Sequence, residues 1–252
     1  MGRLIARHIR EQLPSYRLGG LFSRTTAHAE GLALELGDVP VLGLQQLIET
    51  CDLLVEATSA AAMPDIVRAC LAAGKAINVE FADEVTVEAA RAAVHVPSGA
   101  IAGLDGIRAM REMGLDAVTL TTVKHPRSLG QMPPLSELIP PTAEEALIMS
   151  PEARLLFSGT AEEAIRRFPA NVNVAVSLGL AGLGFSRTRV RLFADPCAAG
   201  TLHHISARAG DCTLETMTRP APLPQNPRSS ALAMYSVPAL LRGLAANPKL
   251  AG

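Results

Sequence analysis

The sequence predicts an α/β protein with a Rossmann-type, doubly wound parallel sheet, followed by an α+β domain with a mainly antiparallel sheet. In the first hundred residues, short apolar runs alternate with helical segments of about ten residues, which is typical of βαβ units. Beyond them the pattern changes. Residues 118–123 read Val-Thr-Leu-Thr-Thr-Val, and this alternation indicates a strand with one exposed face. A chain of 252 residues that is 48% hydrophobic is long enough to bury a core in each part.

The first part is expected to contain helices at 2–12, 26–36, 44–50 and 62–73, and strands at 17–22, 52–57 and 76–79. Pro14 follows the first helix and Gly74 stops the fourth, in line with ordinary helix stop signals. In a dinucleotide-binding fold, a strand and a glycine-rich turn precede the first helix. Because this chain opens on a helix, we expect that strand and two of the glycines to be missing upstream of Met1, with Gly2 as the last glycine.

The second part is expected to contain strands at 118–123, 190–193, 204–207 and 212–218, helices at 160–168 and 172–183, and a loop at 126–141. A proline-rich connector at 220–227 leads to a last helix at 229–244. The domains predicted from this order are a truncated dinucleotide-binding domain at 1–100, a catalytic domain at 101–225, and a C-terminal segment at 226–252. The helix of that last segment is expected to pack back on the first domain.

Composition excludes several classes of function. With 23 basic and 24 acidic side chains, the net charge is −1, and nothing indicates a nucleic-acid partner. The longest apolar segment, 172–185, is interrupted by polar residues and glycines, so we expect no membrane span and no signal peptide, and a cytoplasmic protein. The four cysteines lack metal-ligand spacing, so we expect free thiols and no metal.

The predicted fold itself indicates where a dinucleotide would bind. Gly2 stands at the start of the first helix, where the pyrophosphate is expected. Ser23 and Arg24 follow the second strand without an acidic residue, which favours NADP or use of both cofactors, although Arg24 could equally be a surface-turn residue. Thr58 and Ser59 follow the most apolar strand and are candidates for cofactor contact, although Ser59 could simply cap the next helix.

Several segments carry a more specific signal: Pro97-Ser98-Gly99-Ala100-Ile101-Ala102-Gly103-Leu104-Asp105, Gly159-Thr160-Ala161-Glu162-Glu163-Ala164, Phe168-Pro169-Ala170-Asn171-Val172-Asn173-Val174-Ala175, Val190-Arg191-Leu192-Phe193-Ala194-Asp195-Pro196, Thr201-Leu202-His203-His204-Ile205, and Asn226-Pro227-Arg228-Ser229-Ser230-Ala231-Leu232. In this order, and over nearly the whole chain, they resemble the L-aspartate dehydrogenase family. The Phe-Pro-x-Asn-x-Asn-Val-Ala stretch is the most specific of them.

The resemblance implies oxidation of L-aspartate to iminoaspartate, then oxaloacetate and ammonia, or the reverse, with NAD or NADP as cofactor and a link to NAD biosynthesis. It implies that His203 is the active-site histidine and that Ala100 and Asn173 contact the dinucleotide. A histidine suits proton movement because its pKa lies near working pH. Without the resemblance, His203 would be taken as a surface or core residue and Asn173 as a helix cap.

A substrate with two carboxylates needs cationic partners, and Lys124 and Arg228 are the candidates. Departures from the family's pattern leave two alternatives open. The stretch 78–84 is acidic. Val123 and Glu162 each stand at a position where the family has arginine. These changes are compatible with a non-catalytic relative that binds a ligand or partner, or with an enzyme for another amino acid or imine. The antiparallel sheet is a plausible surface for a homodimer, because most soluble oligomers pair with two-fold symmetry.

Overall fold

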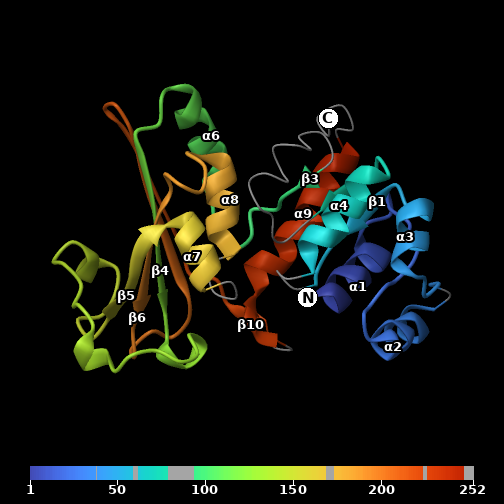
Figure 1. Ribbon diagram of the computed structural model, residues 1–252, viewed down its shortest axis with the longest axis horizontal. Helices are drawn as coiled ribbons and strands as arrows, with labels where there is room; N and C mark the ends of the chain where they lie inside the picture. Colours follow the sequence, from blue (N-terminus) through green and yellow to red (C-terminus); the bar gives the residue numbers. More distant parts are fainter. Residues whose placement is uncertain (38, 59–61, 79–93, 169–172, 224–225, 247–252) are drawn as a thin grey trace. The chain divides into compact units, whose positions relative to one another are not determined.

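The computed structural model describes residues 1–37, 39–58, 62–78, 94–168, 173–223 and 226–246 (Figure 1). The chain divides into two compact units. Unit 1 comprises Met1–Pro97 together with Met234–Gly252, and unit 2 comprises Ser98–Ala233. The fold class predicted from the sequence is confirmed, because one unit holds a parallel α/β sheet and the other a helix-covered mixed sheet.

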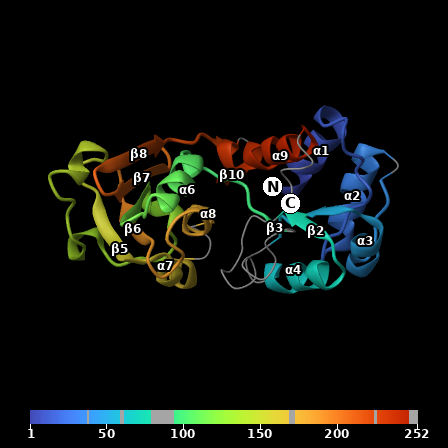
Figure 2. The same cartoon turned by 90° about the horizontal axis from the view of Figure 1, so that it is seen from above.

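Unit 1 is built on the parallel sheet β1-β2-β3, with strands Leu53–Val55, Ala76–Asn78 and Val94–His95. Its helices are α1 (Gly2–Gln12), α2 (Thr26–Leu36), α3 (Leu44–Thr50) and α4 (Met63–Ala72), all close to the predicted positions. Helix α4 lies on one side of the sheet and α1 on the other (Figure 2). The core of the unit is formed by apolar side chains of strands and helices, among them Ile5, Ile9, Leu54, Val67 and Ile77.

The strand predicted at 17–22 is wrong in extent. Only Leu21 pairs, through a single parallel bridge to Val41. The Gly19-Gly20 pair before it has no side chains to pack, which weakens a strand. A Cβ at Gly20 would lie 2.8 Å from a methyl carbon of Leu42, so any other residue there would have to displace that side chain.

Helix α9 (Ala231–Ala246) begins two residues later than predicted, and from Met234 it belongs to unit 1. The Tyr16 hydroxyl donates to the carbonyl of Leu241 at 2.7 Å, and the Arg242 guanidinium donates to the carbonyl of Gln12 at 3.2 Å. These bonds tie α9 to the end of α1. The connector before α9 contains a short antiparallel pair, β9 (Pro222–Leu223) and β10 (Asn226–Ser230).

Unit 2 is a five-stranded sheet with the order β5-β6-β4-β7-β8. Three of its pairings are antiparallel and β4–β6 is parallel, as expected of a mainly antiparallel sheet. Helices α6, α7 and α8 lie together on one face (Figure 1). The strands are β4 (Ala117–Lys124), β5 (Arg154–Thr160), β6 (Arg189–Ala194), β7 (Leu202–Ala209) and β8 (Cys212–Thr218), and the helices are α6 (Leu104–Glu112), α7 (Ala161–Arg167) and α8 (Asn173–Ala181).

Two of these elements, α6 and β5, are not among those expected from the sequence. In α6 the buried residues Leu104, Ile107 and Met110 follow the spacing of one helix face, so the signal is present although the segment is short. In β5 the register shifts between Leu155 and Phe157, and this irregularity breaks the alternation that marks a strand. The loop between β4 and β5 contains three short 3-10 turns, at Pro126–Ser128, Leu135–Glu137 and Glu145–Leu147.

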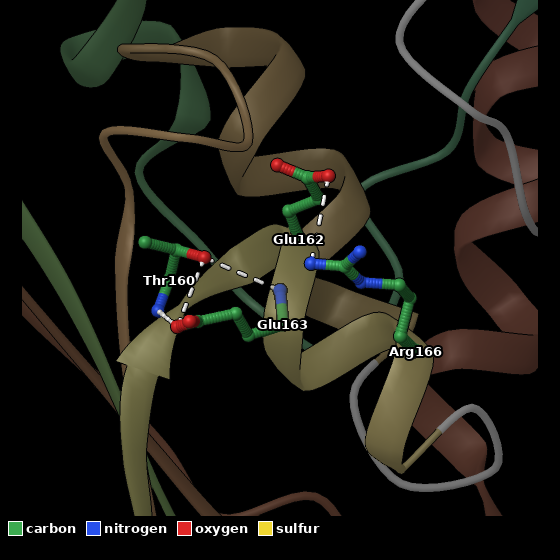
Figure 3. A network of polar contacts seen from close by, with 4 residues as sticks. All are labelled: Thr160, Glu162, Glu163 and Arg166. Atoms are coloured by element: carbon green, nitrogen blue, oxygen red, sulfur yellow. Dashed lines mark hydrogen bonds and ion pairs between the residues drawn. The ribbon is translucent and has the colours of Figure 1, made fainter.

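Helix α7 starts with a capping box (Figure 3). The Glu163 backbone N–H donates to the Thr160 hydroxyl oxygen at 3.2 Å, and the Thr160 N–H donates to the Glu163 carboxylate at 2.8 Å. The Thr160 hydroxyl also donates to this carboxylate at 3.3 Å, and the two bonds that the carboxylate accepts from Thr160 lower the pKa of Glu163. Glu162, where the resemblance led us to expect arginine, is exposed and pairs with Arg166 at 3.7 Å. The Arg166 guanidinium, one turn further along the same helix, therefore compensates the negative charge of Glu162.

Candidate active site

A buried polar cluster of unit 2 lies on the helix-covered face of its sheet. In the strand register, Thr122 of β4 stands opposite His203 of β7, which stands opposite Thr218 of β8. The Thr122 hydroxyl oxygen lies 3.0 Å from Nδ1 of His203 in a buried hydrogen bond, and His203 as a residue is only 6% exposed. This bond fixes the orientation of the imidazole ring and leaves Nε2 as the ring nitrogen available to a ligand.

Lys124 lies two residues beyond Thr122 on β4, so the alternation of the strand places it on the same face. Burial lowers the pKa of Lys124 from 10.5 to about 8. The pKa of His203 falls from 6.5 to about 3, first because of burial and second because of the charge of Lys124. His203 is therefore neutral at physiological pH, whereas Lys124 is close to its titration point.

Two further sequence-predicted residues lie next to this cluster. The Thr218 hydroxyl donates to the carbonyl of Ala100 at 2.7 Å, which ties the turn before α6 to the strand beside His203. Gly99 has a positive φ of 67°, and a Cβ there would lie 3.5 Å from Val174 at the start of α8. Asn173 opens this helix. Its Oδ1 atom is buried and accepts no hydrogen bond from the residues that the structure describes. It is an acceptor suited to an N–H or O–H group of a ligand.

Val123, the other departure from the family's pattern on this strand, points away from the cluster. It is buried on the opposite face of the sheet together with Ala153, Phe193 and Leu202. Its apolar character therefore removes no charge from the surroundings of His203.

A second polar region lies in unit 1, where β1 and β2 end. The Glu56 N–H donates to the carbonyl of Asn78 at 2.8 Å, which continues the parallel pairing by one step. Oε1 of Glu56 accepts from the backbone N–H and the hydroxyl of Thr58. Oε2 of Glu56 and both amide atoms of Asn78 are buried and have no hydrogen-bond partner within the described residues. Such groups are costly to leave unpaired, so this edge fits a polar ligand.

The start of α1 adjoins this region, because a Cβ at Gly2 would lie 3.7 Å from the Cβ of Ala57. A helix N-terminus beside the carboxyl ends of parallel strands is the usual place for a phosphate group. Ser23 and Arg24 lie between Leu21 and α2, with Ser23 half-buried and Arg24 exposed. Ser59 and the stretch 79–84 lie outside the described residues, and so does the side chain of Arg228, which belongs to β10.

The predicted site residues thus form two groups. Gly2, Ser23, Arg24 and Thr58 belong to unit 1, whereas Ala100, Lys124, Asn173 and His203 belong to unit 2. Sequence reasoning missed Glu56 and Asn78 as candidates. The signal that could have found them is a polar residue directly at the carboxyl end of an apolar parallel strand.

A cavity of about 580 Å³ in unit 2 does not coincide with this cluster. It is lined by Val123, Leu202 and loop residues such as Ser150 and Arg219, and its lining includes neither His203 nor Lys124. The Asp195 carboxylate at its wall already accepts bonds from Ser150 and Cys197. Within the described ranges, no group of three or more His, Cys, Asp or Glu side chains is placed to hold a metal ion, and no helix is long and apolar enough to cross a membrane.

A parallel α/β unit followed by a helix-covered mixed sheet is the architecture of a class of two-domain oxidoreductases, and solved structures show this fold. Aspartate dehydrogenase from Thermotoga maritima matches with a TM-score of 0.69 at 24% identity, covering 95% of this chain and 92% of that one. Scyllo-inositol dehydrogenase from Lactobacillus casei, solved with NAD(H) and scyllo-inositol, matches with a TM-score of 0.52 at 9% identity, covering 98% and 86%.

Sequence comparison is more specific than the fold. Residues 105–244 match the family model described as the C-terminal part of aspartate dehydrogenase. L-Aspartate dehydrogenase from Methanocella arvoryzae is 35% identical, covering 96% of this chain and 92% of the relative. The enzyme of that name from Methanothermobacter thermautotrophicus is 33% identical, covering 98% and 93%. The chain belongs to the aspartate dehydrogenase family and is an oxidoreductase, as the sequence resemblance predicted.

Proposed function

We propose that this enzyme catalyses the NAD(P)-dependent oxidative deamination of L-aspartate to iminoaspartate, which water converts to oxaloacetate and ammonia, or the reverse reaction. Its relatives of that name, 33–36% identical over most of the chain, support the substrate. The observation that carries the proposal is the buried contact between His203 and Thr122 beside Lys124. It places a neutral hydrogen-bonding ring and a titratable cation on one face, as an amino-acid substrate requires.

The residues of unit 1 fit a nicotinamide dinucleotide. We assign the pyrophosphate to the start of α1 at Gly2, and other polar parts of the cofactor to Thr58, Ser59 and those atoms of Glu56 and Asn78 that have no partner in the described part of the chain. From unit 2, Ala100 and Asn173 are assigned to the same cofactor. When bound, the oxidised nicotinamide supplies the acceptor for the hydride that leaves Cα of the substrate. Ser23 and Arg24, with no acidic side chain between Leu21 and α2, favour NADP or use of both cofactors.

The residues of the protein must bind the dicarboxylate and move protons, because the cofactor accepts the hydride. Lys124, and Arg228 on β10, are assigned to the substrate carboxylates, while His203 donates a hydrogen bond to or accepts one from the reacting group. A half-buried ammonium pairs strongly with a carboxylate because the local dielectric is low. Asn173 Oδ1, which accepts no hydrogen bond from the described part of the chain, is assigned to the substrate amine or to the cofactor amide.

The direct test is an assay of the purified chain with NAD and with NADP. L-Aspartate, D-aspartate, L-glutamate and L-alanine are compared in the oxidative direction, and oxaloacetate with ammonia in the reductive direction. We expect reduction of the cofactor with L-aspartate well above the other amino acids. Turnover with a different amino acid, and none with L-aspartate, would support the substrate-shifted alternative. Binding of neither cofactor in a calorimeter would support the non-catalytic one.

Three further assignments accompany this proposal: a cytoplasmic enzyme, a supply of iminoaspartate for NAD biosynthesis, and a homodimer. The sheet face opposite the helices supports the last of these, because it presents Met217, 39% exposed, and the half-buried His204 to the outside. A molar mass from light scattering at twice that of the 26.4 kDa chain is expected. A monomer at micromolar concentration would contradict the homodimer but would leave the proposed reaction unaffected.

A further inference from the structure

Two threonine hydroxyls flank the strand that carries His203, and they differ in what they bind. Thr122 of β4 and Thr218 of β8 both stand opposite His203 in the strand register. The Thr218 hydroxyl donates to the carbonyl of Ala100, an atom that can only accept, so the place of its hydrogen is settled. The Thr122 hydroxyl meets Nδ1 of His203, an atom that either donates or accepts. The direction of that bond decides what the ring offers to a ligand.

Only two forms of the His203 ring need to be compared. Burial, and then the charge of Lys124, lower the pKa of His203 from 6.5 to about 3, so the imidazole is neutral at working pH and carries a single N–H hydrogen. In one tautomer that hydrogen is on Nδ1 and is donated to the Thr122 oxygen. In the other it is on Nε2, and Nδ1 accepts the hydrogen of the Thr122 hydroxyl.

The burial of Thr122 distinguishes the two forms. Thr122 is 0% exposed, and within the part of the chain that the structure describes its hydroxyl has no hydrogen-bond partner other than Nδ1 of His203. If Nδ1 donated, the hydroxyl hydrogen would be buried without an acceptor among these residues, which is costly. If Nδ1 accepts, that hydrogen is bonded and only lone pairs of the oxygen are left over. Acceptors that are not fully satisfied are commoner in proteins than orphaned donors.

We propose that Thr122 holds His203 in the tautomer with hydrogen on Nε2, so that His203 donates a hydrogen bond to a carboxylate oxygen of the substrate and takes no proton from it. The inference rests on the proposed function for the identity of the substrate, whereas the tautomer is a property of the chain alone. Thr122 is a positioning residue, because it acts on the substrate only through His203.

A hydrogen on Nε2 selects what the ring can bind. It matches a carboxylate oxygen, which only accepts, and it does not match an ammonium group, which only donates. A hydrogen bond from a neutral N–H to a charged acceptor is stronger than one between neutral groups. The alternation of β4 places Lys124, the other group assigned to the substrate carboxylates, on the same face of the sheet. The ring therefore recognises the acidic part of the substrate rather than its amine.

NMR of the ligand-free protein reads the tautomer directly. In a neutral imidazole the protonated and unprotonated nitrogens have well-separated chemical shifts, and their couplings to the ring C–H protons identify each nitrogen. The chain contains six histidines, and the His203 signals are those that disappear in His203→Asn. We expect Nε2 of His203 to carry the hydrogen at pH 7 and Nδ1 to be unprotonated. A hydrogen on Nδ1 would overturn the proposal.

Two variants test whether the Thr122 hydroxyl sets this arrangement. Thr122→Val keeps the branched shape but removes the donor, so the Nδ1 signal should move downfield. The value of kcat/KM for L-aspartate should fall about tenfold, the order of one hydrogen bond. Thr122→Ser keeps the hydroxyl and should restore the Nδ1 shift and most of kcat/KM. Folded Thr122→Val with the shift and kcat/KM of the unaltered chain would contradict the role of Thr122, and so would a serine variant that restores neither.

Thr121→Val is the matched control, because it removes a hydroxyl from the neighbouring residue of the same strand. Thr121 is also buried, but it stands in register with His204, and the alternation of β4 places it on the opposite face of the sheet. Its His203 signals and its kcat/KM should equal those of the unaltered chain. Changes as large as those in Thr122→Val would assign the effect to the strand as a whole and would also contradict the proposal.

Succinate tests the carboxylate assignment, because it has both carboxylates of L-aspartate and no amine. Added together with NAD, succinate should compete with L-aspartate and move the Nε2 signal of His203, since this nitrogen gains a charged acceptor. An Nε2 signal that moves with L-aspartate but not with succinate would place the ring at the amine and would overturn the donor role.

Failure of the proposed function would look different. If the chain turned over another amino acid, the kinetics would be repeated with that substrate and the binding step with its amine-free analogue. The ligand-free NMR spectrum and the Thr122 variants would decide the tautomer and its cause in the same way. A confirmed tautomer without any response to L-aspartate would keep the role of Thr122 and remove the assignment of L-aspartate.

Discussion

The polar regions of the two units differ in chemistry. At the strand ends of unit 1, buried carboxylate and amide atoms of Glu56 and Asn78 have no partner among the described residues. On the helix-covered face of unit 2, Thr122 and His203 are bonded to each other, and the lysine beside them has a lowered pKa. Buried polar atoms without a protein partner are suited to holding a ligand through hydrogen bonds, whereas a partly buried lysine beside a buried histidine is suited to binding and orienting a charged substrate. The comparison therefore assigns the cofactor mainly to unit 1 and the substrate to unit 2 as a prediction.

The largest effect should come from Lys124→Met. The native pKa of about 8 is below the ordinary 10.5, so the unfolded chain binds this proton more tightly than the fold does. That cost grows as pH falls from 10.5 to 8 and persists at lower pH. Replacing the amine by an apolar chain of similar length should therefore raise Tm at pH 7, by about 2–4 °C for each kcal/mol relieved. Because the variant loses the cation assigned to a substrate carboxylate, kcat/KM for L-aspartate should drop by about 10²-fold or more. A lower Tm together with an unchanged kcat/KM would contradict both expectations.

The pH dependence of stability should separate His203 from the exposed histidines. Its native pKa of about 3 lies below the ordinary 6.5, so burying the neutral ring stabilises the fold fully above pH 6.5. That contribution is lost as pH falls from 6.5 towards 3. We expect Tm of the unaltered chain to fall more steeply between pH 7.5 and 5 than that of His203→Asn, which keeps a hydrogen-bonding side chain. His28→Asn serves as the control, because His28 is an exposed residue of α2. Its Tm should depend on pH in the same way as that of the unaltered chain. Parallel curves for all three proteins would show that His203 is not buried as described.

In unit 1, Asn78→Leu should weaken cofactor binding roughly tenfold, the order of one or two hydrogen bonds in a binding site. The same change should leave the fold as stable or more stable, because it removes two buried polar atoms that have no partner among the residues the structure describes. Fluorescence titration with NADH and NADPH, together with thermal unfolding, measures the two effects. Gln45→Leu, at an exposed position on α3 in the same unit, is the control. Loss of stability without loss of affinity would mean that Asn78 serves the fold and not the ligand.

The capping box of α7 provides a purely structural reference. Thr160→Ala should cost about 1 kcal/mol of unfolding free energy, because the first turn of the helix loses a side-chain acceptor. Thr160→Ser keeps the hydroxyl and should lose much less. Chemical denaturation measures both. Since this box lies outside both polar regions, KM and the pH profile should stay unchanged in either variant, and a shift in the pH profile would link the box to the active site.

The smallest effect is expected at Arg24. Exposed ion pairs contribute about 0.2–1 kcal/mol, so Arg24→Ala should weaken NADPH binding roughly two- to fivefold and leave NADH binding unchanged. The comparison of the two cofactors is its own control. Equal loss for both cofactors, or none for either, would remove Arg24 from the choice between them.

Much of this fold could be predicted from the sequence, because helix periodicity and capping signals are local. Helices α1, α2 and α3 and the alternation in β4 are examples. The strand at 17–22 was overestimated, since its residues suit a strand but Gly19 and Gly20 limit its pairing. Strand β5 was missed because an irregularity in pairing hides its period.

In the site, residue type and resemblance pointed to His203, Ala100 and Asn173, and these assignments stay predictions. The environment of Lys124 could not be predicted, because desolvation depends on which strands surround a side chain. The importance of Glu56 and Asn78 depends likewise on which neighbours leave their polar atoms unpaired, and this is a property of the folded chain.

The central claim is that L-aspartate is oxidised on the face of the sheet that carries His203 and Lys124. The kinetics of L-aspartate oxidation by His203→Asn and Lys124→Met test it most directly, with the unaltered chain and Lys75→Ala as references. The account predicts that kcat/KM falls by about 10²-fold or more in both variants and stays unchanged in Lys75→Ala. Folded His203→Asn and Lys124→Met proteins that keep the kcat/KM of the unaltered chain would contradict it.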